Sequence, residues 1–568
     1  MQNEMKCYLA CPLIEVMDPV CSSAVRRGTA VLQTPLPHRY CRTQKALKKN
    51  YKGLTKPKLC RFLTSSRKIA AGSVIFVDKP LVIAPLPFGN LVCLTCNDLI
   101  KKESMHRCAM CNWPMCSMEC SDSHISKPEC SYLSRDKSCC PEDLEPTGKY
   151  NTIATLRCLL LNYTNQEEFN LILSMVSHVE SRIKDNKKGF IDTVNFISDS
   201  IVKDEFDRKT VYTVYSVLAS NAIGIRSNQG ACLRALYPIH RLLNHSCIPN
   251  VHLTDMDGGL LEVRAACDIG ANEELCATYT PSVTPLWERQ HIFKDSYHFT
   301  CTCARCNDPT EKGTYFSSHK CHKCIDVFMV PNQTEETLLW TCSKCNNQES
   351  YEDIKPVMDQ ILNESESWKT CTAHEVHLLM EKLHPRFHSQ HFVAMKVTQD
   401  VIRTLQDNAS ELEIRLRAHI MKNLANLYSV LEPGLTRRRG MTLMETGSVI
   451  LEVALKDFHS NNGPGYSQIL RQALHSIDYL DEALSIHKLE PANSRGHGMK
   501  HITALKLMLA HKFKDKIRGI MLENIRQKVQ SSVSLQVEDE ALSTKIVIGP
   551  KDNEEKCTKE TNTDIREE

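Results

Sequence analysis

Cysteines in closely spaced pairs are the residues of this 568-residue chain whose chemistry is easiest to infer. The chain has 28 cysteines, and many stand in CxxC or similarly short spacings that suit a tetrahedral zinc ion. The N-terminus lacks the basic and then apolar layout of a secretion signal, so we expect metal binding rather than disulfides. The cysteines therefore predict zinc sites, about four in all.

The densest group of cysteines lies between residues 93 and 130. Two CxxC pairs are followed by a CxxxC spacing, which provides enough ligands for two tetrahedral ions. A segment this short builds little hydrophobic core, so metal binding would supply its folding energy. The candidate ligands are Cys93, Cys96, Cys108, Cys111, Cys116, Cys120, His124 and Cys130.

Two further cysteine groups follow later in the chain. A CxCxxC trio at residues 301–306 has one ligand fewer than a closed tetrahedral site needs. Two CxxC pairs, separated by a short polar and apolar stretch, predict a small zinc ribbon. The cysteines of these groups are Cys301, Cys303 and Cys306, then Cys321, Cys324, Cys342 and Cys345.

A compact polar cluster occupies residues 241–250, which read RLLNHSCIPN. Asn244, His245, Ser246 and Cys247 follow directly after two leucines, and Pro249 blocks the continuation of a helix. A buried polar group without a partner costs about 1–3 kcal/mol, so these side chains must find partners in the fold. Taken alone, the NHS string also fits a plain helix end followed by a loop.

These residues must be positioned by a mixture of strands and helices. Residues 60–85 are rich in Val and Ile and predict short strands around an Ala71-Gly72 turn, while Asp257-Gly258-Gly259 predicts a hairpin turn. Apolar residues recur at intervals of three and four over residues 131–220 and 351–530, which predicts helices. Pro and Gly break the second helical region at residues 432–434 and 463–465. The fold class expected is α+β.

Composition limits the classes of function. Apolar residues make up 42% of the chain and the net charge is +3, so no general attraction to nucleic acid or acidic lipid is expected. No run of 18 apolar residues occurs, and we expect an intracellular protein of the cytoplasm or nucleus, without a membrane partner. Nine basic and no acidic residues lie from Arg39 to Arg61. They predict either a mobile arm or a nuclear-import or nucleic-acid patch.

Several motifs, in this order along the chain, resemble the SMYD family, in which a MYND zinc finger interrupts a SET domain. The cysteine cluster at residues 93–130 resembles a MYND finger. The NHSCxPN string, Glu273-Glu274 and Tyr279 resemble the signature of the SET-domain lysine methyltransferases. The zinc ribbon and the segment LEPGLTRRRG at residues 431–440 resemble the arthropod-specific, msta-like branch of the family.

The resemblance implies a SET-domain β fold that is interrupted by the finger and followed by a TPR-like, all-α C-terminal domain. A polar tail with few aromatic residues ends the chain and is expected to be disordered, as is the N-terminal extension. The implied parts are an N-terminal extension (1–54), the first part of the SET domain (55–91), the MYND finger (92–130), a helical insert (131–218), the SET core (219–285), a post-SET segment (286–310), the zinc ribbon (315–350), the helical domain (351–530) and the tail (531–568).

The resemblance also divides the metal ligands among ions. Ligand pairs interleave in MYND fingers, so Cys93, Cys96, Cys116 and Cys120 would hold one ion. Cys108, Cys111, Cys130 and a histidine would hold the other; the family places that histidine at the position of Ser126, and His124 lies two residues earlier. In the family's post-SET site, Cys247 would complete the trio of Cys301, Cys303 and Cys306.

The resemblance implies a methyl-donor site for S-adenosylmethionine with Tyr279 as the catalytic residue. Tyr279 would lie near the transferring methyl group and help to orient the lysine amine. The segment Cys60-Arg61-Phe62 stands in the position of a family turn that contains two glycines, so Arg61 would contact the donor there. The donor-binding residues implied are Arg61, Asn221, Asn244, His245, Tyr297 and Phe299.

Three functions are compatible with these motifs. The first is a protein-lysine methyltransferase that acts on histone or non-histone substrates. The second is a SET-MYND adaptor or transcriptional regulator without turnover, whose finger binds proline-rich peptides. The third, direct nucleic-acid binding, lacks a recognition-helix pattern and a basic domain outside the arm. A monomer is expected in each case.

Overall fold

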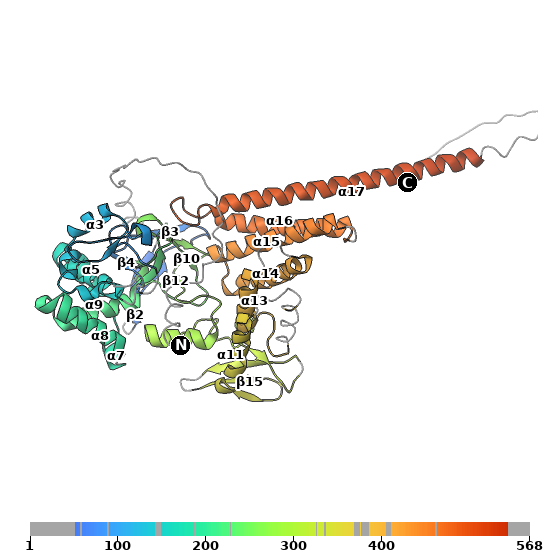
Figure 1. Cartoon of the computed structure of the whole chain (residues 1–568). Coiled ribbons are helices and arrows are strands. Elements are labelled where there is room, and N and C mark those ends of the chain that lie inside the picture. The colour runs from blue at the N-terminus through green and yellow to red at the C-terminus, as the bar shows by residue number, and fades with distance from the viewer. Residues whose placement is uncertain are drawn as a thin grey trace, which may run out of the picture.

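Strands, a small sheet and a helical array follow one another along the chain in the computed structural model (Figure 1). The mixed architecture confirms the α+β fold class. No helix among the described residues combines the length and the apolar character needed to cross a bilayer. The structure describes residues 51–56, 59–87, 90–141, 149–185, 188–227, 229–324, 326–333, 337–367, 375, 385–404, 410–460 and 463–543.

The β core is held together by strands that are far apart in the sequence. One three-stranded sheet has the order β10-β11-β3 and another has the order β4-β8-β7, and all their pairings are antiparallel. Gly258 and Gly259 have positive φ angles at the turn of the β10–β11 hairpin, which confirms that prediction. These strands are β3 (Val74–Asp78), β4 (Val82–Pro85), β7 (Ile223–Arg226), β8 (Cys232–Leu236), β10 (Val251–Asp255) and β11 (Leu261–Ala265).

The first hairpin corrects two expectations from the sequence. Cys60, Arg61 and Phe62 lie in strand β2 (Leu59–Ser65) and do not form a turn. Strand β1 (Tyr51–Lys56) pairs with β2, so residues 51–54 belong to a sheet and not to a disordered extension; residues 1–50 lie outside the described part. The pairing register shifts between Leu54 and Lys56, so the irregular part of the hairpin lies opposite Cys60 and Arg61.

The finger and the helical insert lie between β4 and β7 and are tied to the core by Arg157. Its guanidinium forms a two-point ion pair with Glu129 of the finger at 2.6 and 2.8 Å. It also donates to the carbonyl oxygens of Leu94 in the finger and Ile83 in β4, at 2.7 and 2.6 Å. The elements of this region are β5 (His106–Arg107), β6 (Pro114–Met115), α3 (Met118–Ile125), α4 (Pro128–Leu133), α5 (Tyr150–Thr164), α6 (Gln166–Leu173), α7 (Val179–Lys184), α8 (Lys188–Phe196) and α9 (Arg208–Asn221).

A short helix and a four-stranded sheet connect the β core to the helical domain. Helix α10 (Leu286–Ile292) continues into a π-helical turn, η7 (Phe293–Tyr297), just before the cysteine trio. The cysteine pairs that predicted a ribbon lie at the ends of an antiparallel sheet with the order β13-β14-β15-β16. Its strands are β13 (His319–Lys320), β14 (Phe328–Gln333), β15 (Leu338–Cys342) and β16 (Gln348–Ser350).

The helical domain follows the predicted breaks and docks on the β core through Gly434. Gly434 has a φ angle of 100°, and a Cβ atom there would lie 2.3 Å from the carbonyl oxygen of Ala266. The amide of Leu435 donates to the same oxygen at 2.7 Å. The last helix extends to Ser543, so the prediction of disorder is wrong for residues 531–543. The helices are α11 (Tyr351–Ser367), α13 (Phe392–Thr404), α14 (Glu411–Leu431), α15 (Arg437–His459), α16 (Tyr466–His487) and α17 (Met499–Ser543).

Candidate functional site

The RLLNHSCIPN stretch begins as a turn of 3-10 helix, η5 (His240–Leu242), and then forms the two-residue strand β9 (Asn244–His245). Strand β9 pairs in parallel with β12 (Cys276–Ala277). Asp78 at the end of β3 anchors the start of this stretch, because its carboxylate accepts from the amides of Ile239 and His240 at 2.9 and 2.7 Å. Burial raises the pKa of Asp78 from 3.8 to about 6, although these amides oppose the shift.

The two asparagines of the stretch bind the predicted Glu273-Glu274 element. The Asn244 amide donates to the Glu274 carboxylate at 2.7 Å. The Asn250 amide donates to the Glu273 carboxylate at 3.0 Å, and its oxygen accepts from the Cys276 amide at 2.8 Å. The motifs that were separate in the sequence are therefore one hydrogen-bonded unit.

His245 links the aromatic residues to the cysteine cluster. Its Nδ1 accepts from the Tyr279 amide at 3.0 Å, and its Nε2 lies 3.3 Å from Cys247 Sγ. Burial lowers the pKa of His245 to about 3, so the ring is neutral at pH 7. Because Nδ1 accepts, Nε2 carries the hydrogen and donates to the sulfur. The His245 side chain thus positions Tyr279 and Cys247 relative to each other. The predicted contact of His245 with the methyl donor would be made by its backbone.

Tyr279, Tyr297 and Phe299 come together in space, as the sequence predicted for the site. The ring centroids of Tyr279 and Tyr297 are 4.9 Å apart, and Phe299 stacks on Phe293 at 5.1 Å. The Tyr279 hydroxyl donates to the carbonyl oxygen of Leu243 at 2.6 Å. All three predicted residues are half-buried, so they form an apolar surface with a fixed hydroxyl oxygen at one edge.

The structure places the two other predicted donor contacts differently. Asn221 is the last residue of α9, and its amide nitrogen donates to the carbonyl oxygens of Val176 and Val217 at 2.7 and 2.8 Å. The side-chain nitrogen of Asn221 therefore stabilises the helical insert. The predicted contact with the methyl donor would be made by its side-chain oxygen. The backbone of Arg61 lies in β2, and its side chain lies outside the described part.

Arg182 is a residue of the site that sequence reasoning missed. From helix α7 its guanidinium donates to the Ser220 hydroxyl at 2.9 Å and to the Ser296 carbonyl oxygen at 2.6 Å. These two serines directly precede Asn221 and Tyr297, so Arg182 joins two walls of the candidate site. Arg182 belongs to no motif and its partners are far away in the sequence, so the sequence alone could not predict its role in the site.

Among the described residues, four clusters of ligands have the geometry of tetrahedral metal sites. Within each cluster the four ligand atoms lie within 4.8 Å of one another. The Sγ–Sγ distances of 3.5 Å for Cys96–Cys116 and 3.8 Å for Cys321–Cys345 suit a zinc tetrahedron, whose edges are about 3.8 Å for Zn–S bonds of about 2.3 Å. The clusters are Cys93, Cys96, Cys116 and Cys120; Cys108, Cys111, His124 and Cys130; Cys247, Cys301, Cys303 and Cys306; and Cys321, Cys324, Cys342 and Cys345.

His124 belongs to the second cluster, although it lies two residues before the family position. It is fully buried, and both ring nitrogens lack a hydrogen-bond partner. Burial lowers the pKa of His124 to about 4, so the imidazole is neutral, as a metal ligand must be. A buried imidazole with two unsatisfied nitrogens is costly without a metal, and these residues therefore fit a bound ion.

A buried charged triad surrounds the cluster that contains Cys247. Arg289 and Arg305 both contact the carboxylate of Glu311, at 2.8 and 2.9 Å, and the three side chains are at most 1% exposed. Arg289 also lies 3.5 Å from Cys306 Sγ. Two arginines and one glutamate leave a net positive charge beside the sulfurs, which favours deprotonated thiolates, the form in which cysteine binds zinc.

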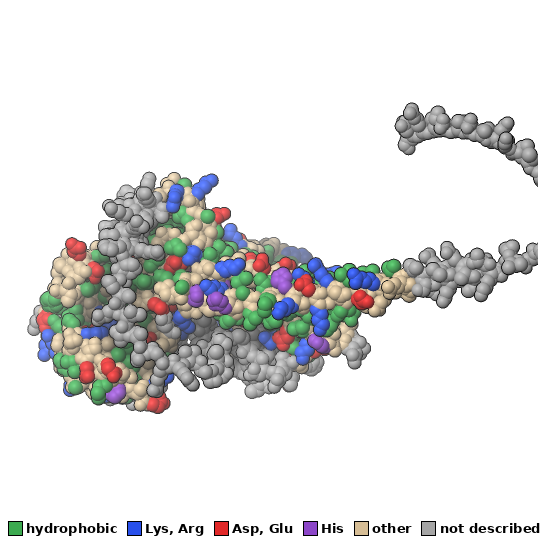
Figure 2. All heavy atoms as spheres, turned by 90° about the horizontal axis from the view of Figure 1, so that it is seen from above, with side chains coloured by type: hydrophobic (Ala, Val, Ile, Leu, Met, Phe, Trp, Pro, Cys, Tyr) green, Lys and Arg blue, Asp and Glu red, His purple; other side chains and the backbone are tan. Residues whose placement is uncertain are grey.

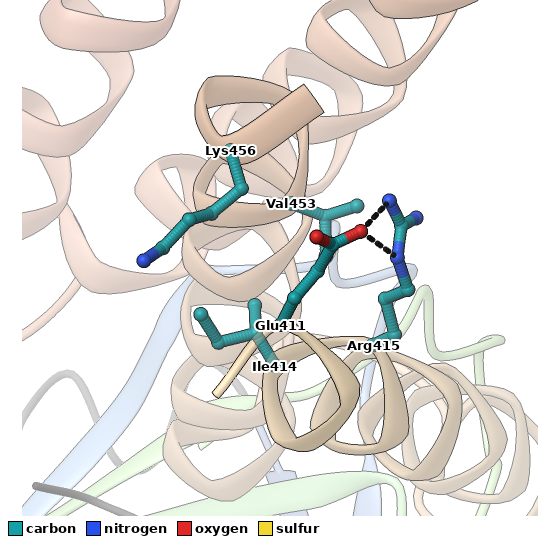
Figure 3. A pocket seen from close by; sticks show the side chains of 5 residues that line it. All are labelled: Glu411, Ile414, Arg415, Val453 and Lys456. Atoms are coloured by element: carbon teal, nitrogen blue, oxygen red, sulfur yellow. Dashed lines mark hydrogen bonds and ion pairs between the residues drawn. The ribbon is translucent and has the colours of Figure 1, made fainter. Parts of the chain in front are cut away.

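A shallow depression elsewhere on the molecule has no chemistry of this kind. It lies between α14 and α15 and is lined by Glu411, Ile414, Arg415, Val453 and Lys456 (Figure 3). Glu411 and Arg415 pair with each other at 2.7 Å. The depression therefore contains a satisfied ion pair, and the aromatic group around Tyr279 is the better candidate site.

Known proteins resemble part of the chain, and the matched SET domain includes Asn244, His245 and Tyr279. The SET domain family model matches residues 60–280. SET domain-containing protein SmydA-8, isoform A, of Drosophila melanogaster is 28% identical over 359 residues, which cover 60% of this chain and 75% of that one. Histone-lysine N-methyltransferase ASHR1 of Arabidopsis thaliana is 24% identical over 379 residues, or 62% and 77% of the two chains. N-lysine methyltransferase SMYD2-B of Xenopus laevis is 28% identical over 260 residues, or 44% and 58%.

Fold, motif geometry and family match together define a SET-domain protein. The interleaved finger clusters and the similarity to SmydA-8 and SMYD2-B support assignment of the chain to the SMYD family. The likeness to the Drosophila protein agrees with the arthropod branch that the sequence predicted.

Proposed function

We propose that the protein is an S-adenosylmethionine-dependent protein-lysine N-methyltransferase. One observation carries the proposal: the Tyr279 hydroxyl is fixed on the carbonyl of Leu243, the residue just before the strand that contains Asn244 and His245, and its ring lies 4.9 Å from that of Tyr297. The names of two relatives, a histone-lysine and an N-lysine methyltransferase, support a lysine side chain as the acceptor.

The aromatic group fits the donor and the acceptor. Phe299 is half-buried and stacks on Phe293, which gives a flat apolar face on which an adenine ring can pack. When bound, S-adenosylmethionine supplies a methyl group on a sulfonium that is already a good leaving group. The protein's contribution is therefore mainly to align the reacting groups and to exclude water.

Tyr279 and Tyr297 would prepare the lysine amine for attack. The amine must be neutral, and an apolar aromatic wall lowers its pKa by disfavouring the charged ammonium form. The hydroxyl hydrogen of Tyr279 is donated to Leu243, so its oxygen accepts a hydrogen bond from the amine and orients its lone pair.

The remaining parts have supporting roles in this proposal. Zinc in the four clusters would stabilise the finger, the post-SET segment and the ribbon. The finger would bind proteins, with proline-rich peptides as one candidate class, and the protein would act in the cytoplasm or the nucleus.

Donor binding and a conservative variant test the proposal. Addition of S-adenosylmethionine at millimolar concentration should raise the melting temperature of the zinc-loaded protein, since a ligand of the native state stabilises it. Tyr279→Phe should lower the methylation of a histone mixture by about 10²-fold while donor binding persists. Tyr466→Phe, at an exposed position on α16, is the matched control and should leave the rate unchanged. If S-adenosylmethionine neither produces heat in a calorimetric titration nor raises the melting temperature, the methyltransferase proposal is contradicted and the adaptor function is favoured.

A further inference from the structure

Helix α17 is much longer than the bundle on which it packs. Its start lies beside the end of α16, where His487 Nδ1 and Thr503 Oγ1 are 2.8 Å apart. The bundle ends near Phe458, whose ring lies 5.7 Å from that of Phe513 and 4.7 Å from Lys516 Nζ. From Leu522 to Ser543 the helix extends beyond its neighbours for about 33 Å (Figure 1).

Three apolar side chains form a stripe at the start of this projecting part. Leu522, Ile525 and Val529 are 58%, 56% and 56% exposed. Their spacing of three and then four residues places them within about 60° of one another around the helix. This is the spacing of core positions in a coiled coil, and it is narrower than the apolar face of about 100° or more that a helix presents to a core or a bilayer.

Basic residues surround the stripe. Between Lys512 and Lys528 six lysines and arginines stand against two acidic residues, whereas the whole chain has a net charge of only +3. Arg518 precedes Leu522 by one turn, and Arg526 and Lys528 lie on the two sides of the stripe. Hydrophobic and basic side chains lie next to each other along this helix (Figure 2).

The charge and the width of the stripe together select one class of occupant. A second copy aligned in parallel would place the same cations opposite one another, which is unfavourable. A bilayer surface would use a wider apolar face than three residues provide. A single helix with apolar core positions and acidic flanking positions satisfies both the stripe and its cations.

We propose that residues 522–529 of α17 are a docking surface for one acidic amphipathic helix of a partner protein, which pairs with α17 as a short two-helix coiled coil. This inference does not depend on methyl transfer, because the surface lies on the helical domain beyond the β core.

A designed peptide tests the surface. The probe is a peptide of about three heptads with Leu at the core positions and Glu at the flanking positions; a second peptide has Lys at the flanking positions. The full zinc-loaded chain should bind the Glu peptide at least tenfold more tightly than the Lys peptide, as measured by fluorescence anisotropy at low salt. Equal binding of the two peptides, or no binding of the Glu peptide, would overturn the proposal.

Variants on two sides of the same helix locate the contact. Leu522→Lys with Ile525→Lys should weaken binding of the Glu peptide at least tenfold. Leu505→Lys with Leu509→Lys changes two residues that are also exposed and closely spaced, but on another side of α17, and should change affinity by less than twofold. Equal losses in both double variants would contradict the assignment. Arg526→Glu with Lys528→Glu should reverse the preference between the two peptides.

Two further measurements decide between occupants. Co-sedimentation with vesicles that contain about 30% phosphatidylserine, when neither peptide binds, would replace the proposal with a membrane surface. Sedimentation equilibrium that shows a dimer, abolished by Leu522→Lys with Ile525→Lys, would replace it with a second copy. A monomer that ignores the vesicles and binds the Glu peptide supports the proposal.

Discussion

The post-SET cluster (Cys247, Cys301, Cys303 and Cys306) and the zinc ribbon each have four cysteine ligands, yet the surroundings of the two clusters differ. The ribbon takes its ligands from residues 321–345, and Cys345 is exposed. The post-SET cluster takes Cys247 from the NHSC stretch, where it is buried and bound by His245. Identical ligand sets can therefore serve a local module in one place and a part of the candidate active site in another.

The charged residues near the two clusters differ in the same way. Arg289, Arg305 and Glu311 beside the post-SET cluster are almost fully buried. Glu349 of the ribbon pairs with His319 and with Arg386, whose side chain is 34% exposed. Burial of all three side chains makes the first group costly to disturb, whereas the partly exposed Arg386 should be easier to replace.

Removal of one ligand from each cluster should give the largest effects. Cys247→Ser should release one zinc ion and abolish donor binding, because it removes both a metal ligand and the partner of His245. Cys345→Ser should also release one zinc ion but keep donor binding, since the ribbon lies outside the aromatic group. Zinc content and thermal shift with S-adenosylmethionine would measure both; loss of donor binding in Cys345→Ser would contradict the independence of the ribbon.

Removal of one arginine from each charged group should give the next largest effects. Arg289→Met leaves Glu311 with a single buried partner and should lower the free energy of unfolding by about 3–5 kcal/mol. Arg386→Met at the half-exposed pair should cost about 1 kcal/mol or less. Urea unfolding at neutral pH measures both changes, and similar losses in the two variants would refute the role given to burial.

The pH dependence of Asp78 and Glu349 should have opposite signs. Burial raises the pKa of Asp78 to about 6, so its stabilising contribution is present below pH 4 and is lost as pH rises through 6. The free energy of unfolding of the wild type relative to Asp78→Asn should therefore fall by about 2 kcal/mol between pH 4 and 7.

The hydrogen bond to His319 lowers the pKa of Glu349 to about 2, so its contribution is present above pH 4.5 and is lost as pH falls toward 2. Relative to Glu349→Gln, the wild type should therefore gain stability as pH rises through that window. Denaturant unfolding at several pH values checks both signs. If the free energy of unfolding of the wild type relative to Asp78→Asn instead rose with pH, the hydrogen bonds from the amides would lower the pKa of Asp78 more than burial raises it.

Arg182 should show the smallest effect, and mainly on catalysis. Arg182→Met removes the bonds that join the residues before Asn221 and Tyr297, and kcat should fall about tenfold with little change in the melting temperature. Arg182→Lys keeps the charge without the forked geometry and should recover part of the rate. Arg208→Met, at an exposed ion pair on α9, is the control. Equal losses of stability and rate would indicate a purely structural role.

Cysteine spacing was the most informative part of the sequence. It predicted about four metal sites, because tetrahedral coordination restricts ligand number and spacing. The resemblance to the SMYD family then supplied the division of the finger ligands and the contribution of Cys247. Turn residues predicted the β10–β11 hairpin and the breaks between α14 and α15 and between α15 and α16. These features follow from local chemistry that a short stretch of sequence contains.

Features that depend on distant partners could not be read from the sequence. Asp78, Arg157 and Arg182 are single charged residues whose partners are brought to them only by the fold. Residues 60–62 lie in a strand because β1, in the basic arm, pairs with Leu59 and Phe62 on either side of Cys60 and Arg61. The polar composition after residue 530 suggested disorder, but no Pro or Gly occurs between Gly519 and Gly549 to end α17 earlier.

The four hydrogen-bonded contacts of Arg157 have a consequence for any ligand of the finger. They join the finger directly to strand β4 and helix α5 through one side chain. A peptide bound by the finger would therefore be held at a set distance and direction from Tyr279. Only a target lysine separated from the gripped motif by a matching length of chain would gain a high effective concentration at the site.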